Sequence, residues 1–172
     1  RRTMMIAQQL YEGIELGEQG SVGLITYMRT DSTRVAKEAQ EEARDYIVKT
    51  YGSTYIPDKA RRVYRKGAQD AHEAIRPTSV TRHPDEIKHF LNNDQYRLYK
   101  LIWQRFLASQ MSTALFDVVS VDIEAAGMTF RATGSTIKFQ GFMKVYTEGK
   151  DDDKIVADEE QPPLPSMVEG QV

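Results

Sequence analysis

Two side chains suited to phosphate chemistry stand close together in the segment VGLITYMRTDS, residues 22–32. Tyr27 carries a phenol hydroxyl that can act as a nucleophile, and Arg29 carries a permanent positive charge. If residues 25–29 are extended, alternate side chains share one face, so the hydroxyl and the guanidinium lie together. Attack on a phosphodiester requires such a nucleophile beside a cation that offsets charge on the phosphoryl oxygens. The sequence therefore predicts Tyr27 and Arg29 as catalytic residues.

The polar residues that follow favour the start of a helix. Thr30, Asp31 and Ser32 are all good N-cap residues, and the free N–H groups of a helix N-terminus attract anions. We therefore expect Thr30 and Ser32, with Arg34 just beyond them, to contact the phosphate backbone of a nucleic acid. Taken singly, these features also have ordinary interpretations, namely a packed tyrosine, a surface arginine and simple helix capping.

A second segment, AHEAIRPT at residues 71–78, adds a histidine and an arginine. His72 and Arg76 are four residues apart, which would place them on one side of a helical turn. Both can contact a phosphate, and a histidine can transfer protons near neutral pH. Glu73 would point elsewhere and orient a basic partner. The spacing lacks the second histidine of a zinc-protease helix, so we predict no metal ligands in this chain.

Helices are expected to position these residues. Apolar residues at helical spacing indicate a first helix, capped by Thr3 and stopped by Gly13, and a long amphipathic helix that ends at Gly52. A glycine-rich connection and a strand at 22–27 are expected between them. Pro84 is placed to open a short helix over residues 84–91, and Asn93 or Asp94 to cap a longer one that reaches residue 111.

The pattern changes near residue 113. FDVVSVDIEA alternates between apolar and polar residues, and Gly127, Gly134 and Gly141 separate further strand-like runs, which predicts an antiparallel meander. A final strand is expected at residues 167–172. The fold class is therefore α+β, with a helical, tyrosine-bearing domain at 1–113 and an antiparallel β segment at 114–172. This segment has several open edges and is expected to need a partner.

The composition suits a folded protein, and the absence of cysteine is compatible with a reducing cytoplasm. The chain has 172 residues, of which 40% are hydrophobic, and it contains no cysteine. We expect no export signal and no membrane span. The formal net charge is −2, but residues 59–83 hold seven basic residues against two acidic ones, and residues 148–160 hold seven acidic against two basic. The basic stretch is suited to phosphates, or both stretches are simply solvated.

The segments GLITYMRTDS and AHEAIRPT, in this order, resemble those of bacterial type IA DNA topoisomerases, and the resemblance covers the whole chain. It implies that Tyr27 cuts one DNA strand and stays linked to its 5′ phosphate, while Arg29 positions and neutralises that phosphate. His72 and Arg76 would contact DNA near the active site. The phosphotyrosine ester preserves the energy of the broken bond, so rejoining the strand needs no ATP.

The resemblance also implies what the intact enzyme adds. Such enzymes carry an N-terminal domain whose clustered acidic residues bind Mg²⁺, and no such cluster opens this sequence; the acidic residues 151–153 are expected to be solvated surface. We therefore expect a piece of a longer bacterial, nucleoid-associated enzyme. Its partners would be single-stranded or negatively supercoiled DNA and the missing domain of the same chain. The piece alone is expected not to relax supercoiled DNA.

Two other functions remain open at this point. A non-catalytic module could hold single-stranded DNA through the basic stretch and stacking tyrosines. A tyrosine recombinase also combines tyrosine, arginine and histidine, but its tyrosine follows the other two in the chain, whereas Tyr27 precedes His72 and Arg76. The polarity of the covalent link separates recombinase from topoisomerase, because the recombinase attaches to a 3′ phosphate.

Overall fold

The computed structural model describes residues 1–57, 72–148 and 164. The chain divides into two compact units, Arg1–Ser112 and Thr113–Val172, and each is described by itself below. Most of the basic stretch, the acidic run from residue 149 and the strand expected at 167–172 lie outside the described residues. Within the described part, no helix has both the length and the apolar character needed to cross a bilayer.

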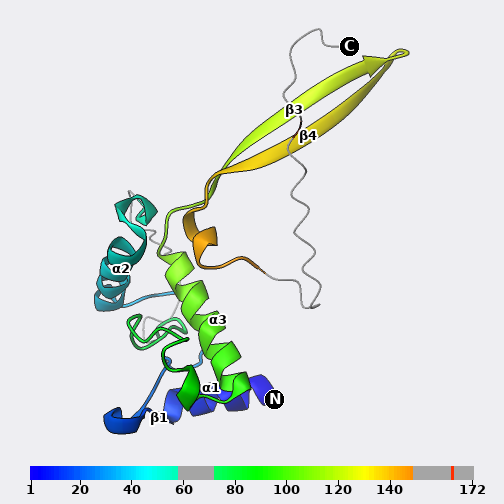
Figure 1. Ribbon diagram of the computed structural model, residues 1–172. Helices are drawn as coiled ribbons and strands as arrows, with labels where there is room; N and C mark the ends of the chain where they lie inside the picture. The colour runs from blue at the N-terminus through cyan, green and yellow to red at the C-terminus, as the bar shows by residue number, and fades with distance from the viewer. Residues whose placement is uncertain (58–71, 149–163, 165–172) are drawn as a thin grey trace. The chain divides into compact units, whose positions relative to one another are not determined.

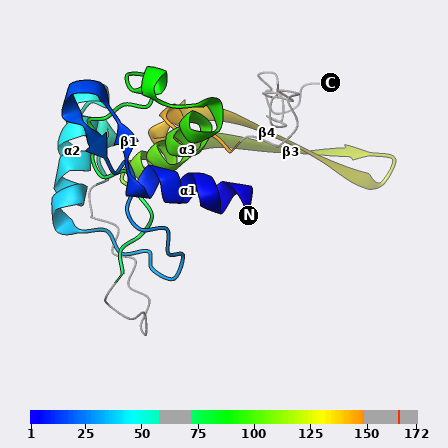
Figure 2. The ribbon, with the colours of Figure 1, turned by 90° about the horizontal axis from the view of Figure 1, so that it is seen from below.

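Three helices form the frame of the first unit (Figure 1). Their bounds are α1 at Arg2–Glu12, α2 at Lys37–Tyr51 and α3 at Asn93–Ser109. Helix α3 starts with a capping box, in which Asn92 and Gln95 each bond the other's backbone N–H. Helix α1 crosses α3 near this end, where the Gln95 amide donates to Gln9 at 3.1 Å (Figure 2).

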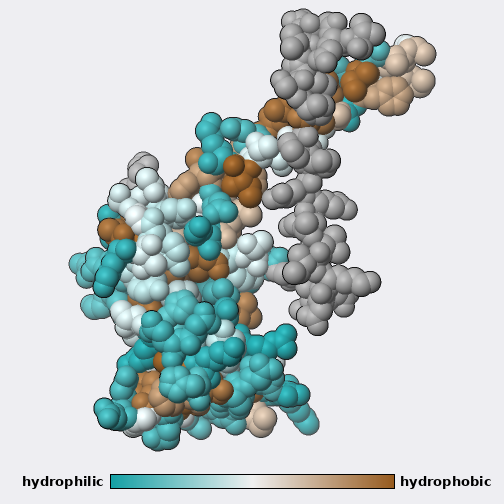
Figure 3. Space-filling view, in the orientation of Figure 1, coloured by the Kyte–Doolittle hydropathy of each residue, from teal (hydrophilic) through white to brown (hydrophobic). Residues whose placement is uncertain are grey.

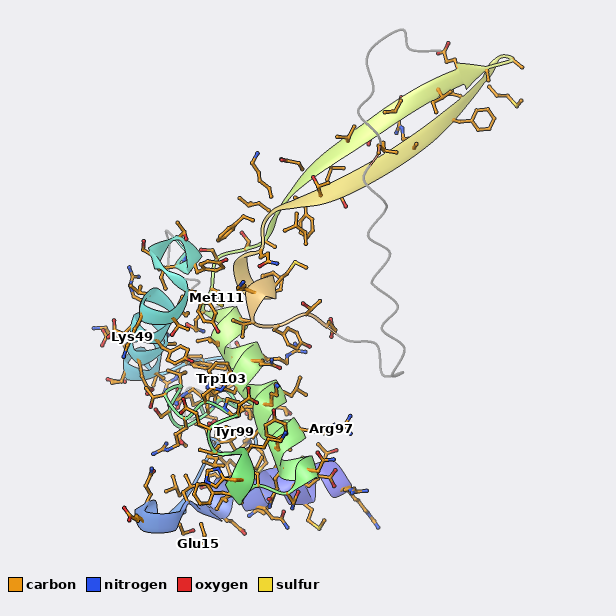
Figure 4. All side chains as sticks on the ribbon, viewed as in Figure 1. Glu15, Lys49, Arg97, Tyr99, Trp103 and Met111 are labelled. Atoms are coloured by element: carbon orange, nitrogen blue, oxygen red, sulfur yellow. The ribbon has the colours of Figure 1, made fainter. Side chains whose placement is uncertain are left out.

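The core of this unit is built around α3. Figure 4 shows Tyr99 and Trp103 on the side of α3 toward α2, with Arg97 on the other side. The Trp103 ring meets the edge of Tyr46 from α2 at a centroid distance of 5.7 Å, and its Nε1–H donates to the carbonyl of Val80. The Tyr99 hydroxyl donates to the carbonyl of Arg82, and burial raises its pKa. Helix α3 thus fixes the loop that follows residue 78.

Several predicted element boundaries are confirmed and several are wrong. Helices α1 and α2 end at Gly13 and Gly52 as expected, where φ is 136° and 100°. Helix α1, however, begins at Arg2, and Thr3 does not cap it. The short helix expected at 84–91 is reduced to a 3₁₀ turn at Lys88–Phe90.

The glycine-rich connection after α1 is not simply flexible. Strands β1 at Ile14–Glu15 and β2 at Ser21–Val22 pair in antiparallel fashion, with a 3₁₀ turn at Gly17–Gln19 between them. Another 3₁₀ turn of this unit, Ser53–Tyr55, directly follows α2. The small hairpin brings the chain back toward the end of α1, so that Leu24 can bond the Leu10 carbonyl.

In the second unit, residues 113–148 contain one long hairpin rather than the expected meander. Strand β3 runs from Leu115 to Ala125 and pairs with β4 from Met128 to Phe139. Ala126 and Gly127 join the two strands, and both have positive φ, 50° and 76°. Two-residue hairpin loops with positive φ at both residues match the twist of the flanking strands. Gly134 lies inside β4 and does not interrupt it, and residues Gly141–Lys144 form a 3₁₀ turn. The α+β class is confirmed.

The predicted alternation along β3 is present, although its apolar side is not covered by the described residues. Val119, Ile123 and, across the pair, Phe130 are each about half exposed. Figure 3 shows hydrophobic side chains along this hairpin. On the other face, Arg131 forms two hydrogen bonds with Asp122, at 2.7 and 3.0 Å. An uncovered apolar face of this kind fits the expectation that the β segment needs a partner.

Candidate active site

The residues just before Tyr27 are held by two neighbouring segments. The Leu24 N–H donates to the carbonyl of Leu10 in α1, and the Leu24 carbonyl accepts from Thr78 N–H at 3.0 Å. Ile25 forms a single antiparallel bridge with Pro77. Leu24 and Ile25 are fully buried. The strand expected at residues 22–27 is therefore shorter than predicted, but its end is fixed on both sides.

Thr26 adds the closest link between the two segments. Its N–H donates to the carbonyl of Arg76, and its hydroxyl donates to the carbonyl of Ala74 at 2.7 Å. The same hydroxyl accepts from Arg76 N–H at 3.0 Å. Thr26 and Ala74 are 48 positions apart in the chain. These bonds bring the segment after His72 beside the residue before Tyr27.

Gly23 permits the close approach of α1 to this strand. A Cβ atom at this position would lie 2.7 Å from the carbonyl oxygen of Tyr11, closer than real contacts allow. We expect Gly23→Ala to move the end of α1 and to lower the free energy of unfolding by about 1–3 kcal/mol. Urea unfolding, followed through the fluorescence of the single tryptophan, measures the change. An unchanged midpoint would contradict this account of the packing.

Tyr27 lies where the chain leaves the buried strand. The residue is 53% exposed, and its ring packs against the Tyr11 ring in an edge-to-face arrangement, with centroids 5.3 Å apart and an interplanar angle of 66°. The backbone then turns tightly, because Arg29 N–H donates to the Tyr27 carbonyl at 2.8 Å. The predicted extended conformation through residue 29 is therefore wrong. Tyr27 and Arg29 nevertheless line one pocket.

The Arg29 guanidinium contacts two side chains, His72 and Asp31. Its Nη1 lies 3.0 Å from Nε2 of His72, and its Nε lies 2.9 Å from Oδ2 of Asp31. Because a guanidinium only donates, Nε2 of His72 accepts this bond and Nδ1 carries the ring hydrogen. Nδ1 is buried and has no hydrogen-bond partner among the described residues. The ring hydrogen of His72 therefore has no acceptor among the described residues and is not exposed at the surface.

The pocket has a volume of about 310 Å³. Its lining residues come from α1, the strand end and the segment after residue 71, and they are Tyr11, Thr26, Tyr27, Arg29, His72 and Glu73. A phenol, a guanidinium and an imidazole therefore border a single opening. Such a set can attack, neutralise and hydrogen-bond a phosphate.

Glu73 is the carboxylate that joins the histidine segment to α2. It accepts from Nε and Nη2 of Arg76 at 2.8 and 3.0 Å, and from the N–H of Ala36, the N-cap residue of α2. Burial raises the pKa of Glu73, but the hydrogen bonds from Arg76 and Ala36 and the charges of Arg76 and Arg34 outweigh it, so the pKa lies below its usual value. Glu73 is therefore ionised and anchors both neighbours.

Arg76 is directed at Glu73 and not into the pocket. Its side chain is only 12% exposed, and Nη1 donates to the carbonyl of Pro77. Residues 72–76 are not helical, so the prediction that His72 and Arg76 share one side of a helical turn is wrong. His72 lines the pocket, whereas Arg76 stabilises the segment that carries it.

The Glu73 anchor predicts a stability change that depends on pH. At pH 7, Glu73→Gln is expected to cost about 2 kcal/mol, somewhat less than the loss of a partner from a fully buried ion pair. Since the folded pKa is lowered from 4.5, the stabilisation is complete above that pH and disappears as the pH falls through the folded value.

Urea unfolding of wild type and variant between pH 3 and 7 checks this prediction, which requires the difference to shrink below about pH 4.5. Glu41→Gln is a matched control, because Glu41 pairs with Lys37 on the exposed surface of α2 and should matter little. A difference that stays constant with pH would contradict the role of the ionised carboxylate.

The remaining predicted residues do not line the pocket. Helix α2 begins at Lys37, so the expectation that residues 30–32 cap it is wrong. Thr30 and Arg34 are exposed, and the Ser32 hydroxyl accepts from Arg34 N–H. The Arg34 carbonyl accepts from Ala74 N–H at 2.7 Å, which ties this loop to the histidine segment. Contact of Thr30, Ser32 and Arg34 with DNA stays a prediction.

Sequence reasoning missed three contributors to the site: Tyr11, Thr26 and Asp31. The partners of Tyr11 and Thr26 are distant in the chain, and no local pattern signals them. Asp31 is different, because a carboxylate two residues after an arginine at a turn is a plausible ion-pair partner. The position of Asp31 before a helix predicts capping instead.

The pocket does not fit a magnesium ion by itself. Among the described residues, no group of three or more acidic or histidine side chains could hold a metal. The carboxylate that lines the pocket, Glu73, already accepts from Arg76 and Ala36. Mg²⁺ prefers several free oxygen ligands.

Comparison with known proteins identifies the family. A sequence profile described as DNA topoisomerase matches residues 1–172. A structure of full-length topoisomerase I from Thermotoga maritima is similar to this chain, with 42% sequence identity and a TM-score of 0.72. The match covers 89% of this chain and 24% of that one, so this chain spans about a quarter of its relative. The chain belongs to the family of bacterial type IA DNA topoisomerases.

Proposed function

We propose that this chain carries the strand-cleaving site of a type IA topoisomerase, with Tyr27 as the nucleophile. Its hydroxyl oxygen forms a bond to a backbone phosphorus and loses its proton, while the bond from phosphorus to the 3′ oxygen breaks. The 5′ phosphate stays on Tyr27, and the freed 3′ hydroxyl reverses the reaction when the strand is rejoined. The observation that carries this proposal is the shared pocket of Tyr27, Arg29 and His72.

Arg29 has the charge that the transferred phosphate requires. Its guanidinium is about half exposed and is held from two sides by His72 and Asp31, so its orientation is set before DNA binds. Preorganised donors of this kind stabilise the charge that develops on the phosphoryl oxygens. We assign Arg29 to this role.

His72 supplies a hydrogen-bond donor next to Arg29. Its Nδ1–H is buried and has no partner among the described residues, so a phosphate oxygen can accept from it only after the ring moves. The imidazole can take up a proton during cleavage only if Nε2 is released from Arg29, because Nδ1 already carries the ring hydrogen. We therefore assign His72 to the phosphate, whereas Arg76 acts through Glu73 and not by touching DNA.

The DNA substrate is proposed to be a single-stranded region of negatively supercoiled DNA. Thr30, Ser32 and Arg34 form the loop after the pocket and are assigned to the DNA backbone; Thr30 and Arg34 are exposed there. In this proposal the helical unit holds the tyrosine, and the β hairpin is part of an arch completed by other parts of the chain. The enzyme would act in the bacterial cytoplasm.

Relaxation of supercoils requires more than this chain, because it spans only a quarter of the related enzyme. Type IA topoisomerases generally use Mg²⁺ and no ATP, and we place the ligands for that ion outside the residues described here. A bound Mg²⁺ would supply further charge neutralisation at the phosphate. The 172-residue chain alone is expected not to relax a supercoiled plasmid.

The test is to identify the covalent link in the full-length enzyme. The enzyme is incubated with a single-stranded oligonucleotide and Mg²⁺, denatured rapidly, digested and analysed by mass spectrometry. The expected product is a peptide that contains Tyr27 esterified to a 5′ phosphate. A 3′ link would favour recombinase chemistry, a link to another tyrosine would overturn the assignment, and binding without any adduct would favour a non-catalytic module.

A further inference from the structure

We infer that Tyr11 is a positioning residue, whose ring fixes the orientation of the Tyr27 ring for attack. This inference rests on the proposed function, because it assumes that Tyr27 is the nucleophile. Tyr11 lines the same pocket but comes from a different element, the last turn of α1. It is also 40% exposed, so its ring is not needed to fill the core.

The backbone of Tyr11 is firmly placed. Helix α1 buries Ile6, Ala7 and Leu10 against the rest of the unit, and the Leu10 carbonyl accepts from Leu24 N–H at 2.7 Å. Gly23 approaches so closely that an added Cβ would clash with the Tyr11 carbonyl oxygen. The end of α1 is therefore fastened to the strand that leads into Tyr27.

The ring of Tyr27 needs such support. More than half of this side chain is exposed, so few neighbours limit rotation about its side-chain bonds. The edge of Tyr11 meets it at 5.3 Å and 66°, which is within the favourable range for aromatic pairs. Both rings line the pocket that Arg29 and His72 also line, so this contact limits how the Tyr27 ring can turn there.

Correct orientation matters twice in the proposed reaction. The hydroxyl must be in line with the bond that breaks, and the phosphotyrosine must then stay within reach of the 3′ hydroxyl. Small errors in placing a reacting atom are costly, and a shift of about 1 Å can slow a reaction by about 100-fold. Loss of the Tyr11 ring is thus expected to slow cleavage and rejoining together.

The experiment compares Tyr11→Leu with Tyr11→Phe in the full-length enzyme. Phenylalanine keeps the ring contact, whereas leucine keeps an apolar side chain without it. Single-turnover cleavage and rejoining are measured at saturating single-stranded oligonucleotide, together with affinity for that oligonucleotide and the thermal unfolding midpoint. We expect about a tenfold loss of both rates for Tyr11→Leu and less than about a twofold loss for Tyr11→Phe. The affinity and the unfolding midpoint should be unchanged.

A matched control is available on another helix. Tyr51 occupies the last turn of α2 and pairs with Tyr55 at a centroid distance of 6.0 Å, and neither residue lines the pocket. Tyr51→Leu removes a comparable aromatic contact and should leave both rates unchanged. A similar loss of rate in Tyr51→Leu would mean that any lost aromatic pair slows the enzyme, which overturns the inference.

Other outcomes also decide the question. Wild-type rates in Tyr11→Leu, equal losses in Tyr11→Leu and Tyr11→Phe, or losses that follow a lower unfolding midpoint would each overturn the positioning role. Tyr27→Phe, measured in the same assay, keeps the two proposals apart. An adduct in Tyr27→Phe means that the proposed function fails, whereas no adduct there with normal rates in Tyr11→Leu means that only this inference fails.

Discussion

Replacing Tyr27 with phenylalanine is expected to remove covalent strand cleavage, with a loss of rate of about 10⁴-fold or more. The substitution deletes one oxygen atom and keeps the ring that packs against Tyr11. Because this side chain is more than half exposed, the fold should not change. The whole effect is therefore a loss of the nucleophile, and affinity for single-stranded DNA should stay within about twofold of the wild type.

The measurement for Tyr27→Phe is the amount of DNA that becomes attached to the full-length enzyme after rapid denaturation. Tyr51→Phe is the matched control, since it deletes a hydroxyl from α2 and should leave the yield unchanged. Binding assays on both variants separate lost chemistry from lost affinity. Adduct formation by Tyr27→Phe at a substantial rate would show that another residue attacks the phosphate.

Replacing Arg29 with alanine has the second largest expected effect, a loss of about 10²–10³-fold in the cleavage rate at saturating DNA. The variant lacks the charge that offsets the phosphoryl oxygens. It also leaves the Asp31 carboxylate without its partner at 2.9 Å and removes the donor to Nε2 of His72. An unpaired carboxylate close to the phosphate would add repulsion to the lost stabilisation.

Arg29→Lys tests whether charge alone is sufficient. A lysine carries the charge but lacks the planar fork that contacts His72 and Asp31 together, so only part of the rate should return. Single-turnover rates at saturating DNA are the measurement, and Arg97→Ala, on the exposed side of α3, is the control. A variant Arg29→Ala that binds DNA weakly but cleaves normally once saturated would assign Arg29 to binding only.

The sequence was a good guide where structure depends on neighbours in the chain. The ends of α1 and α2 follow from Gly13 and Gly52, and the apolar spacing located the helices and the alternating strand β3. The association of Tyr27 with Arg29 was also predictable from their spacing. The chain between Tyr27 and Arg29 forms a tight turn, however, and not the extended strand on which that prediction rests.

The sequence was a poor guide where the deciding partner is distant. Ser32 and its neighbours are good capping residues, yet Ala36 is the N-cap of α2 and its N–H is satisfied by Glu73, 37 positions later. His72 likewise meets Arg29 across 43 positions. The glycine spacing predicts a strand boundary at Gly134, but pairing with Val119 keeps this residue within β4. Local propensity does not contain these long-range contacts.

The pairing of Thr26 with the segment at Ala74–Arg76 has a consequence for how such sequences can diverge. The entropy of closing a loop grows only slowly with its length, and doubling the 48-position separation would cost about 0.6 kcal/mol. Insertions between α2 and His72 should therefore be tolerated in related enzymes. A single residue inserted into either paired segment would instead shift the register of the hydrogen bonds between them, and should be selected against.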